Sequence, residues 1–291
     1  MLPLPPKPKG LAKIWREIKR PFRKKEKKCL FDDSHYRELC RNTTMLMILS
    51  KLTGESMLRM EGVIEEYVFW ESLLSGTNKL CGIEGERFET DAEVIEPHMS
   101  VLEELGQRFP IQNIAILDVG AGPLTVIRKI YKGIRLNITA VDALADYYDN
   151  LLKKYGVDPP VRTQQCKGED ITQHFPAESF HWINSRNALD HMERPVECIK
   201  GMLTLLKPGG MISLFHHLNE GADANYAGFH QWNFFLEDDD FCIAGKNGKD
   251  HVNVTKMLLP HYTTSTRVSG WLDSLDPRQD CLQVIVRCAK K

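Results

Sequence analysis

The chain has 291 residues, of which 42 % are hydrophobic and 26 % charged, a composition typical of a globular protein with a buried core. Its formal net charge is −1, but residues 1–28 alone carry +9, which leaves −10 for the rest. An acidic body is unlike that of nucleic-acid-binding proteins, so we expect no nucleic-acid partner. The eight cysteines lack C-x-x-C spacing, which predicts reduced thiols in a cytoplasmic protein.

Residues 1–28 predict a basic tail that contains a short amphipathic helix. Leu11, Ile14 and Ile18 recur at helical spacing beside Trp15, while lysines and arginines occupy the other positions. We expect this tail to lie on an anionic surface at the inner face of the membrane, where each nearby cation contributes about 1 kcal/mol. The alternatives are a solvated tail and a helix that docks on its own domain.

Residues 29–112 predict a helical cap or lid. We expect three helices. The first runs from Asp33 or Ser34, as its cap, to about residue 49, the second from about 57 to 73, and the third from about 92 to 105. No strand pattern interrupts them.

Residues 113–291 show a different pattern, in which apolar, β-rich runs alternate with helical ones. The runs cover residues 114–119, 136–141, 161–166, 180–185, 211–217, 241–244 and 282–288. This alternation predicts an α/β domain with a doubly wound, mostly parallel, seven-stranded sheet and helices on both faces. Ligands of such sheets bind beyond the carboxyl ends of the strands, near the point where the strand order reverses.

The first of these runs ends in an acid and a glycine-rich turn, Asp118-Val119-Gly120-Ala121-Gly122. We expect this turn to open a helix with Pro123 in its first turn. A phosphate-binding P-loop would need a following lysine, and a dinucleotide loop would favour a smaller residue at Thr125. The turn by itself therefore leaves a cofactor loop and a bare structural turn both open.

Further motifs follow at the ends of the next predicted strands. Asp142 ends the second strand, where a carboxylate can accept both hydroxyls of an adenosine ribose. Asp170, in Gly168-Glu169-Asp170-Ile171, is placed to accept the amine of an adenine. Residues 206–210, Leu-Lys-Pro-Gly-Gly, predict a tight turn before the fifth strand.

In this order and spacing, the motifs resemble the class I S-adenosylmethionine-dependent methyltransferases over about residues 113–217. The resemblance implies a Rossmann-like methyltransferase fold with S-adenosyl-L-methionine as cofactor. Leu124 departs from the pattern, because many members carry a third glycine there. The residues expected to bind the cofactor are Asp118, Gly120, Ala121, Gly122, Asp142, Ala143, Glu169, Asp170, Ile171, Ser185 and Asn187. For Asn187 the acceptor is the alternative ligand.

Polar side chains follow the fourth and fifth predicted strands, and we expect both groups to open onto one crevice. His191 or His217 is the expected base, because imidazole titrates near neutral pH, and Arg186 is expected to orient an anionic acceptor. His216, His217, Glu220 and His230 offer a metal site as an alternative. His216 and His217 point to opposite faces of a strand, however, so we expect no metal.

The sequence therefore predicts an O-methyltransferase that acts on a small-molecule or glycan/lipid-linked acceptor at the cytosolic membrane face. The alternative is a non-catalytic cofactor-binding or partner-binding protein of the same fold. A nucleic-acid methyltransferase is disfavoured, because no Asn/Asp-Pro-Pro-Tyr/Phe tetrad follows the fourth strand.

Overall fold

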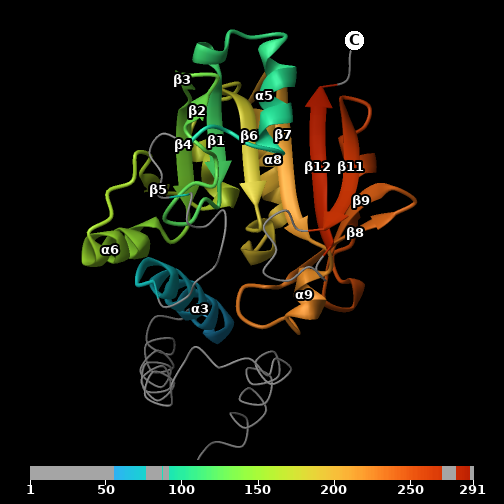
Figure 1. Ribbon diagram of the computed structural model, residues 1–291. Helices are drawn as coiled ribbons and strands as arrows, with labels where there is room; N and C mark the ends of the chain where they lie inside the picture. The colour runs from blue at the N-terminus through green and yellow to red at the C-terminus, as the bar shows by residue number, and fades with distance from the viewer. Residues whose placement is uncertain (1–55, 77–86, 88–91, 271–279, 289–291) are drawn as a thin grey trace, which may run out of the picture.

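The computed structural model describes residues 56–76, 87, 92–270 and 280–288. A seven-stranded sheet with the order β11-β12-β7-β6-β1-β4-β5 forms its centre (Figure 1). Strands β1 (Ala115–Val119), β4 (Asn137–Asp142), β5 (Thr163–Gln165), β6 (Phe180–Arg186) and β7 (Leu206–His217) are parallel. Strand β12 (Asp280–Cys288) pairs antiparallel with β7, and β11 (Tyr262–Gly270) pairs antiparallel with β12. The predicted doubly wound, mostly parallel sheet is confirmed, and its strand order reverses at β1.

Helices cover both faces of this sheet, because successive strand residues point to opposite sides. On one face, α5 (His98–Gly106) and the short η1 (Ile111–Asn113) pack over Ile116, Trp182 and Met211. On the other face, α8 (Pro195–Leu205) and α7 (Ile171–His174) pack over Leu117 and Ile183. In β6, for example, every residue but the last is buried, as expected of a strand in a sheet with both faces covered.

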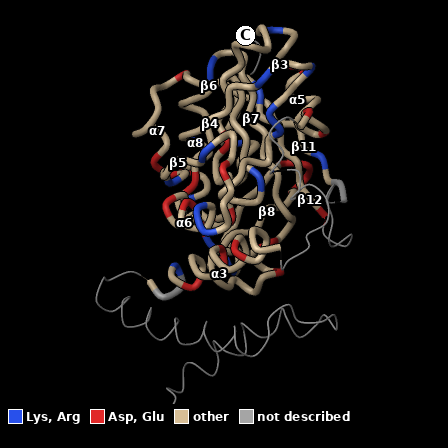
Figure 2. The backbone as a smooth tube through the Cα atoms, turned by 60° about the vertical axis from the view of Figure 1, so that its left-hand side comes forward, with Lys and Arg blue, Asp and Glu red and all other residues tan. Residues whose placement is uncertain are grey.

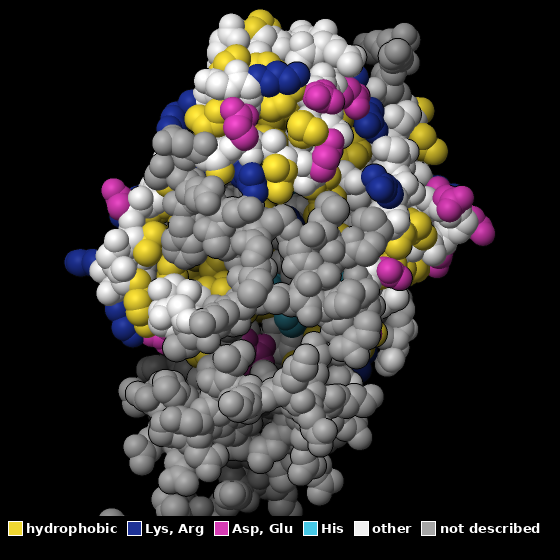
Figure 3. Space-filling view, viewed as in Figure 1, with side chains coloured by type: hydrophobic (Ala, Val, Ile, Leu, Met, Phe, Trp, Pro, Cys, Tyr) yellow, Lys and Arg dark blue, Asp and Glu magenta, His cyan; other side chains and the backbone are white. Residues whose placement is uncertain are grey.

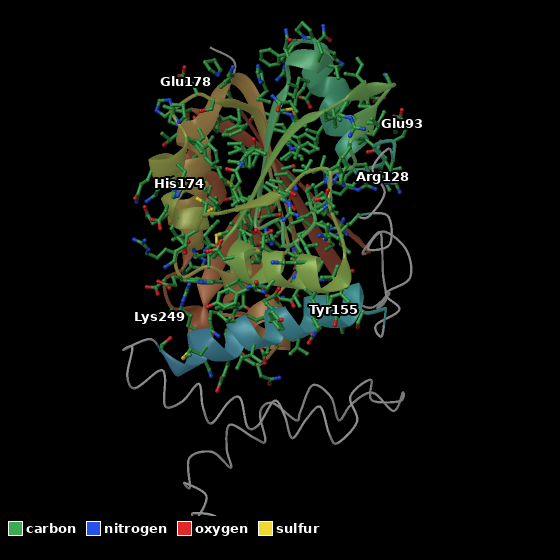
Figure 4. The ribbon with its side chains drawn as sticks, turned by 90° about the vertical axis from the view of Figure 1, so that its left-hand side faces the viewer. Glu93, Arg128, Tyr155, His174, Glu178 and Lys249 are labelled. Atoms are coloured by element: carbon green, nitrogen blue, oxygen red, sulfur yellow. The ribbon has the colours of Figure 1, made fainter. Side chains whose placement is uncertain are left out.

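The carboxyl ends of the parallel strands point toward α3 (Met57–Leu74) and α9 (Glu220–Asp223) (Figure 1). Helix α3 begins after Ser56, whose side chain accepts a hydrogen bond from the backbone N–H of Arg59. It lies against α6 (Ala145–Tyr155), where Tyr155 donates to Glu71 over 3.3 Å (Figure 4). The predicted helix near 57–73 is confirmed, and it lies at the ligand-facing edge of the sheet.

A smaller sheet with the order β10-β9-β8 packs beside the main one. It comprises β8 (Trp232–Glu237), β9 (Asp240–Gly245) and β10 (Val252–Asn253), followed by α10 (Val254–Leu258). The expectation that the run 241–244 joins the main sheet is therefore wrong. The place at the edge of the main sheet belongs to β11, whose threonine- and serine-rich sequence gave no apolar signal because an edge strand needs little burial.

Three further local expectations are wrong. Residues 123–129 form turns in place of a helix, and the short pair β2 (Ile130–Tyr131) and β3 (Ile134–Arg135) follows them. The Pro-Gly-Gly segment lies inside β7, at a shift in the register with β6, and makes no turn before the strand. The helix expected from residue 92 begins at His98, because Glu93 pairs with Ile130 and the residue before Pro97 disfavours helix.

The tail 1–28 and the helix expected over residues 33–49 lie outside the described residues. Within the described part of the chain, no helix combines the length and apolarity that crossing a membrane requires.

Candidate functional site

The glycine corner, residues 120–122, follows β1 and is fixed by the neighbouring strand β4. The backbone N–H groups of Gly120 and Ala121 both donate to the carbonyl of Val141, over 2.9 and 3.1 Å. Gly122 donates to Oδ2 of Asp142 over 3.0 Å, and Leu144 donates to Oδ1 over 2.8 Å. Both glycines have positive φ angles, +72° and +64°, a backbone conformation that favours glycine. The corner and the strand-end acid thus form one unit.

Asp118 lies in the interior below this corner, only 1 % exposed. Its Oδ2 accepts from Thr125 over 2.6 Å and its Oδ1 accepts from Asn184 over 2.8 Å. The Oδ1 of Asn184 in turn accepts from Ser213 over 2.8 Å, and this chain of bonds joins β1, β6 and β7. Both oxygens of Asp118 thus accept hydrogen bonds from protein groups, and the cofactor contact that the sequence predicts for it stays a prediction. Burial raises the pKa of its carboxyl.

The other residues predicted to bind the cofactor line the same edge of the sheet. The carbonyl of Ala143 accepts from Gln165, the carboxylate of Glu169 from the backbone of Arg194, and Oδ1 of Asp170 from Gln173. The Ile171 side chain is fully buried in the core, which leaves its backbone as the part near a ligand. Ser185 is also fully buried, and Asn187 follows β6 with a φ of +48°. Their cofactor contacts stay predictions.

Trp70 of α3 covers the glycine corner, a contact that the motif analysis missed. A Cβ on Gly122 would stand 2.5 Å from the Trp70 ring. The indole N–H donates to Glu66 over 3.2 Å, and the Arg87 guanidinium lies 5.2 Å from the ring centroid. The spacing of the apolar residues Val63, Tyr67, Trp70 and Leu74 on α3 is the signal that identifies this buried face.

A cluster of histidines and carboxylates lies at the ends of β6 and β7. Asp190, fully buried, places Oδ2 2.7 Å from Nδ1 of His230 and 3.3 Å from Nε2 of His191. The two histidine nitrogens are 3.3 Å apart. Glu66 of α3 lies 3.6 Å from Nδ1 of His191, and Glu220 lies 3.6 Å from Nδ1 of His230. We call Asp190, His191, His230 and Glu220 the histidine–carboxylate cluster.

The charges of this cluster are strongly coupled. Burial by itself would raise the pKa of Asp190, but His191 and His230 outweigh burial and hold it well below its usual range. Burial would likewise lower the pKa of His230, but its bond to Asp190 and the nearby carboxylates raise it to about 9. Burial raises the pKa of Glu220 to about 7. Neutral pH therefore leaves an Asp190–His230 ion pair next to a carboxyl that is ready to lose or take up a proton.

Of the three residues predicted to be catalytic, the structure places only His191 in this cluster. On β7 it is His216, the neighbour of His217, that faces the cluster. His216 interacts electrostatically with Asp190, and its ring stacks on that of Phe234 with the centroids 4.5 Å apart. Arg186 faces α5, where its charge helps lower the pKa of buried His98 after the larger effect of burial. The predicted roles of His217 and Arg186 stay predictions. Asp190 and His230 are among the polar side chains that follow the fourth and fifth predicted strands, but their separation by 40 residues gives no sign of their contact.

Acidic residues also gather around this edge of the molecule. Helix α3 carries four of them, Glu61, Glu65, Glu66 and Glu71, against a single arginine, and the tube view shows the concentration near α3 (Figure 2). In the space-filling view, histidine and acidic side chains lie together at the level of the strand ends (Figure 3). The edge therefore suits a cation or a cationic group better than a polyanion.

Comparison with known proteins finds one family model and a number of solved structures. Residues 117–214 match the family model of a methyltransferase domain, and no curated protein matches the chain. The fold is similar to that of 1,6-didemethyltoxoflavin-N1-methyltransferase of Burkholderia thailandensis with bound S-adenosylhomocysteine, at 14 % identity, 78 % of this chain, 88 % of that chain and a TM-score of 0.42. It is also similar to the N-methyltransferase NodS of Bradyrhizobium japonicum, at 15 % identity, 72 % and 88 % coverage and a TM-score of 0.42.

The strand order and the glycine corner joined to a strand-end acid resemble those of the class I S-adenosylmethionine-dependent methyltransferases. Residues 117–214 form a methyltransferase domain, and the chain is an S-adenosylmethionine-dependent methyltransferase with S-adenosyl-L-methionine as its cofactor. The residues present fit that group, because Gly120 and Asp142 are only partly buried and a carboxylate at this strand end can accept the ribose hydroxyls.

Proposed function

We propose that this methyltransferase transfers the methyl group to a hydroxyl oxygen of a small-molecule or glycan/lipid-linked acceptor. The observation that carries the proposal is the position of His191, which stands between the carboxylates of Asp190 and Glu66. A hydroxyl acceptor needs such a group, because it must lose its proton to become a good nucleophile.

The histidine–carboxylate cluster is adjacent to the cofactor corner. Ala188 lies two residues before Asp190 and packs against Gly120. A Cβ on Gly120 would collide with the Cβ of Ala188. Glu66 joins the two regions from the other side, since it accepts from Trp70, which packs on Gly122, and faces His191. A methyl group held at the corner would therefore face an acceptor held at the cluster.

The transfer is an in-line displacement at the methyl carbon. S-Adenosyl-L-methionine would supply an activated methyl group, and its transfer to the acceptor hydroxyl would form a carbon–oxygen bond and leave a neutral thioether and a proton. Alignment of the two reactants can supply about 7–11 kcal/mol of the barrier in ideal cases. The hydroxyl proton passes to the cluster, where His191 is the expected acceptor and Asp190 would stabilise the imidazolium that forms.

The acceptor and the place of action rest on the sequence. The +9 charge and amphipathic spacing of residues 1–28 support a cytoplasmic enzyme attached to the inner face of the membrane, where a lipid-linked acceptor would be presented. The excess of acidic residues around α3 argues against a nucleic-acid acceptor.

Labelled S-adenosylmethionine and cell extract would test the reaction, with mass spectrometry of the product to identify the methylated atom. We expect an O-methyl product. The His191→Ala variant should lose about 10²- to 10⁴-fold in kcat while its affinity for S-adenosylhomocysteine stays within twofold. His261→Ala, which changes an exposed histidine, is the matched control. An N- or C-methyl product, or full activity of His191→Ala, would refute the proposal.

The membrane association has a separate test. The full chain and a chain without residues 1–28 are sedimented with vesicles that contain or lack anionic lipid. We expect only the full chain to bind, and only to anionic vesicles, while both chains bind S-adenosylhomocysteine equally. Equal sedimentation of the two chains would contradict the membrane proposal and leave the methyl transfer untouched.

A further inference from the structure

The side-chain atoms of Asp190, His191 and His230 converge on one point. Oδ2 of Asp190, Nε2 of His191 and Nδ1 of His230 form a triangle with edges of 3.3, 3.3 and 2.7 Å. Ligands about 2.1 Å from one ion stand about 3.0 Å apart in octahedral geometry and about 3.4 Å apart in tetrahedral geometry. Two edges already lie in this range, and the third needs to lengthen by only about 0.3 Å.

The surroundings support these three atoms as ligands. Nδ1 of His191, the nitrogen that faces away from the triangle, lies 3.6 Å from Oε1 of Glu66. A carboxylate behind a histidine is the usual arrangement in metal sites, because it fixes the ring and makes the ligating nitrogen more basic. Two imidazoles and one carboxylate on one side of an ion are a donor set that suits divalent transition metals and leaves positions open for other ligands.

Buried polar atoms next to the triangle lack partners. Within the described residues, Oδ1 of Asp190 and both ring nitrogens of His216 make no hydrogen bond, and these side chains are at most 1 % exposed. Oε2 of Glu220 is buried and also makes no hydrogen bond there. Buried polar atoms without partners are costly, so their concentration at one place indicates a ligand that the protein is built to hold.

The charge of the region also calls for a cation. The groups that most strongly affect Asp190, Glu65 and Glu220 through space are histidines and other carboxylates. No lysine or arginine is among these dominant partners in the described part of the chain. A divalent ion would add positive charge beside Glu65 and Glu220, whose charges are offset among these partners by histidines alone.

We propose that Asp190, His191 and His230 bind one divalent transition metal ion, with Glu220 beside its open face. The expectation of no metal rested on the opposite directions of His216 and His217. His230 and Glu220 of the same candidate set do lie together, and Asp190 and His191 join them. The use of the ion rests on the proposed function. The acceptor hydroxyl would bind at an open position, where the ion lowers its pKa. In the metal-bound enzyme His191 would be a ligand, so Glu220 would replace it as the acceptor of the hydroxyl proton.

A second group of similar composition serves as an internal comparison. Glu237, Cys242 and His251 also place ligand atoms within 4.8 Å of one another. Glu237 and His251 are exposed, however, and Oε1 of Glu237 already pairs with His251 over 3.1 Å. This group shows no unpartnered buried atom among the described residues, so we expect it to bind metal more weakly than the first.

The test measures metal binding directly, without cofactor or acceptor. The full-length protein is freed of metal by a chelator and titrated with Zn²⁺ by calorimetry and with Co²⁺ by visible absorption. We expect one tight site per chain and a Co²⁺ spectrum without a thiolate charge-transfer band. His191→Ala and His230→Ala should each weaken that site at least about 100-fold. His261→Ala and His251→Ala should leave it unchanged.

The outcomes separate this proposal from the proposed function. The metal site is refuted if the wild-type chain binds no stoichiometric ion, or if His191→Ala and His230→Ala bind the ion as tightly as the wild type does. It is also refuted if His251→Ala loses the ion and a thiolate band points to Cys242 as a ligand. Circular dichroism and S-adenosylhomocysteine affinity show whether each variant is folded. An O-methyl product with no metal bound would leave the proposed function standing and remove only the ion.

Discussion

A Cβ on Gly120 would collide with the Cβ of Ala188, so the cofactor corner and the loop that carries Asp190 and His191 are packed against each other without a side chain between them. This contact places the end of β1 next to the end of β6, at the point where the strand order reverses. The geometry of methyl transfer therefore depends on one glycine that needs both a positive φ and the absence of a side chain.

Gly120→Ala should lower the free energy of unfolding by clearly more than the roughly 1 kcal/mol that a positive φ alone costs an alanine. Gly133 is the matched control, since its φ is +75° and a Cβ there would have nothing within 4 Å. Urea unfolding of Gly120→Ala and Gly133→Ala measures the two losses. Equal losses would show that the collision with Ala188 is relieved at no cost.

Asn184→Ala should destabilise the protein by about 2–3 kcal/mol, because it removes a hydrogen bond to the buried Asp118 carboxylate. It also removes the acceptor of Ser213. Asn150→Ala, an exposed change on α6, should stay within about 0.5 kcal/mol of the wild type. A loss as small as that of the control would mean that the buried hydrogen-bonded chain contributes little.

Asp142→Ala should weaken S-adenosylhomocysteine binding at least about tenfold, or about 1.4 kcal/mol, through loss of the ribose hydrogen bonds. Its carboxylate also fixes the Gly122 backbone, so the corner itself should loosen. Calorimetry of Asp142→Ala against Asp149→Ala, an exposed aspartate on α6, isolates the effect. Unchanged affinity would refute the assignment of Asp142 to the ribose.

Cofactor binding should also depend on pH through Asp142. Burial raises the pKa of this carboxyl to about 6, with hydrogen bonds from Leu144 and Gly122 acting in the opposite direction. Protonation removes the charge that accepts the ribose hydroxyls, so affinity should be full above this pKa and fall as the pH drops below 6, by at most about tenfold per unit. Calorimetry between pH 5 and pH 8 should show this fall in the wild type. Asp142→Asn should give a flat profile, and a wild-type profile equally flat would contradict the prediction.

Much of the fold could be predicted from the sequence, because the signals are local. Five apolar runs mark the parallel strands, and residues 118–122 and Asp142 mark the ligand-facing edge whatever surrounds them. The errors fall where local signals compete with distant contacts. Thr125 bonds Asp118 and the backbone of Ile127, which holds residues 123–129 in turns where the proline and its spacing favour a helix.

The sequence by itself determined the class of enzyme, the cofactor and the edge of the sheet where the chemistry occurs, since turn residues and strand-end acids act over a few neighbouring positions. Only the tertiary structure decided which polar side chains meet there. Glu66, Asp190 and His230 come from a helix and two loops far apart in the chain, and they converge because α3 and the loop after α9 pack over the strand ends. Such convergence depends on burying apolar surface between distant segments, and no spacing within the sequence encodes it.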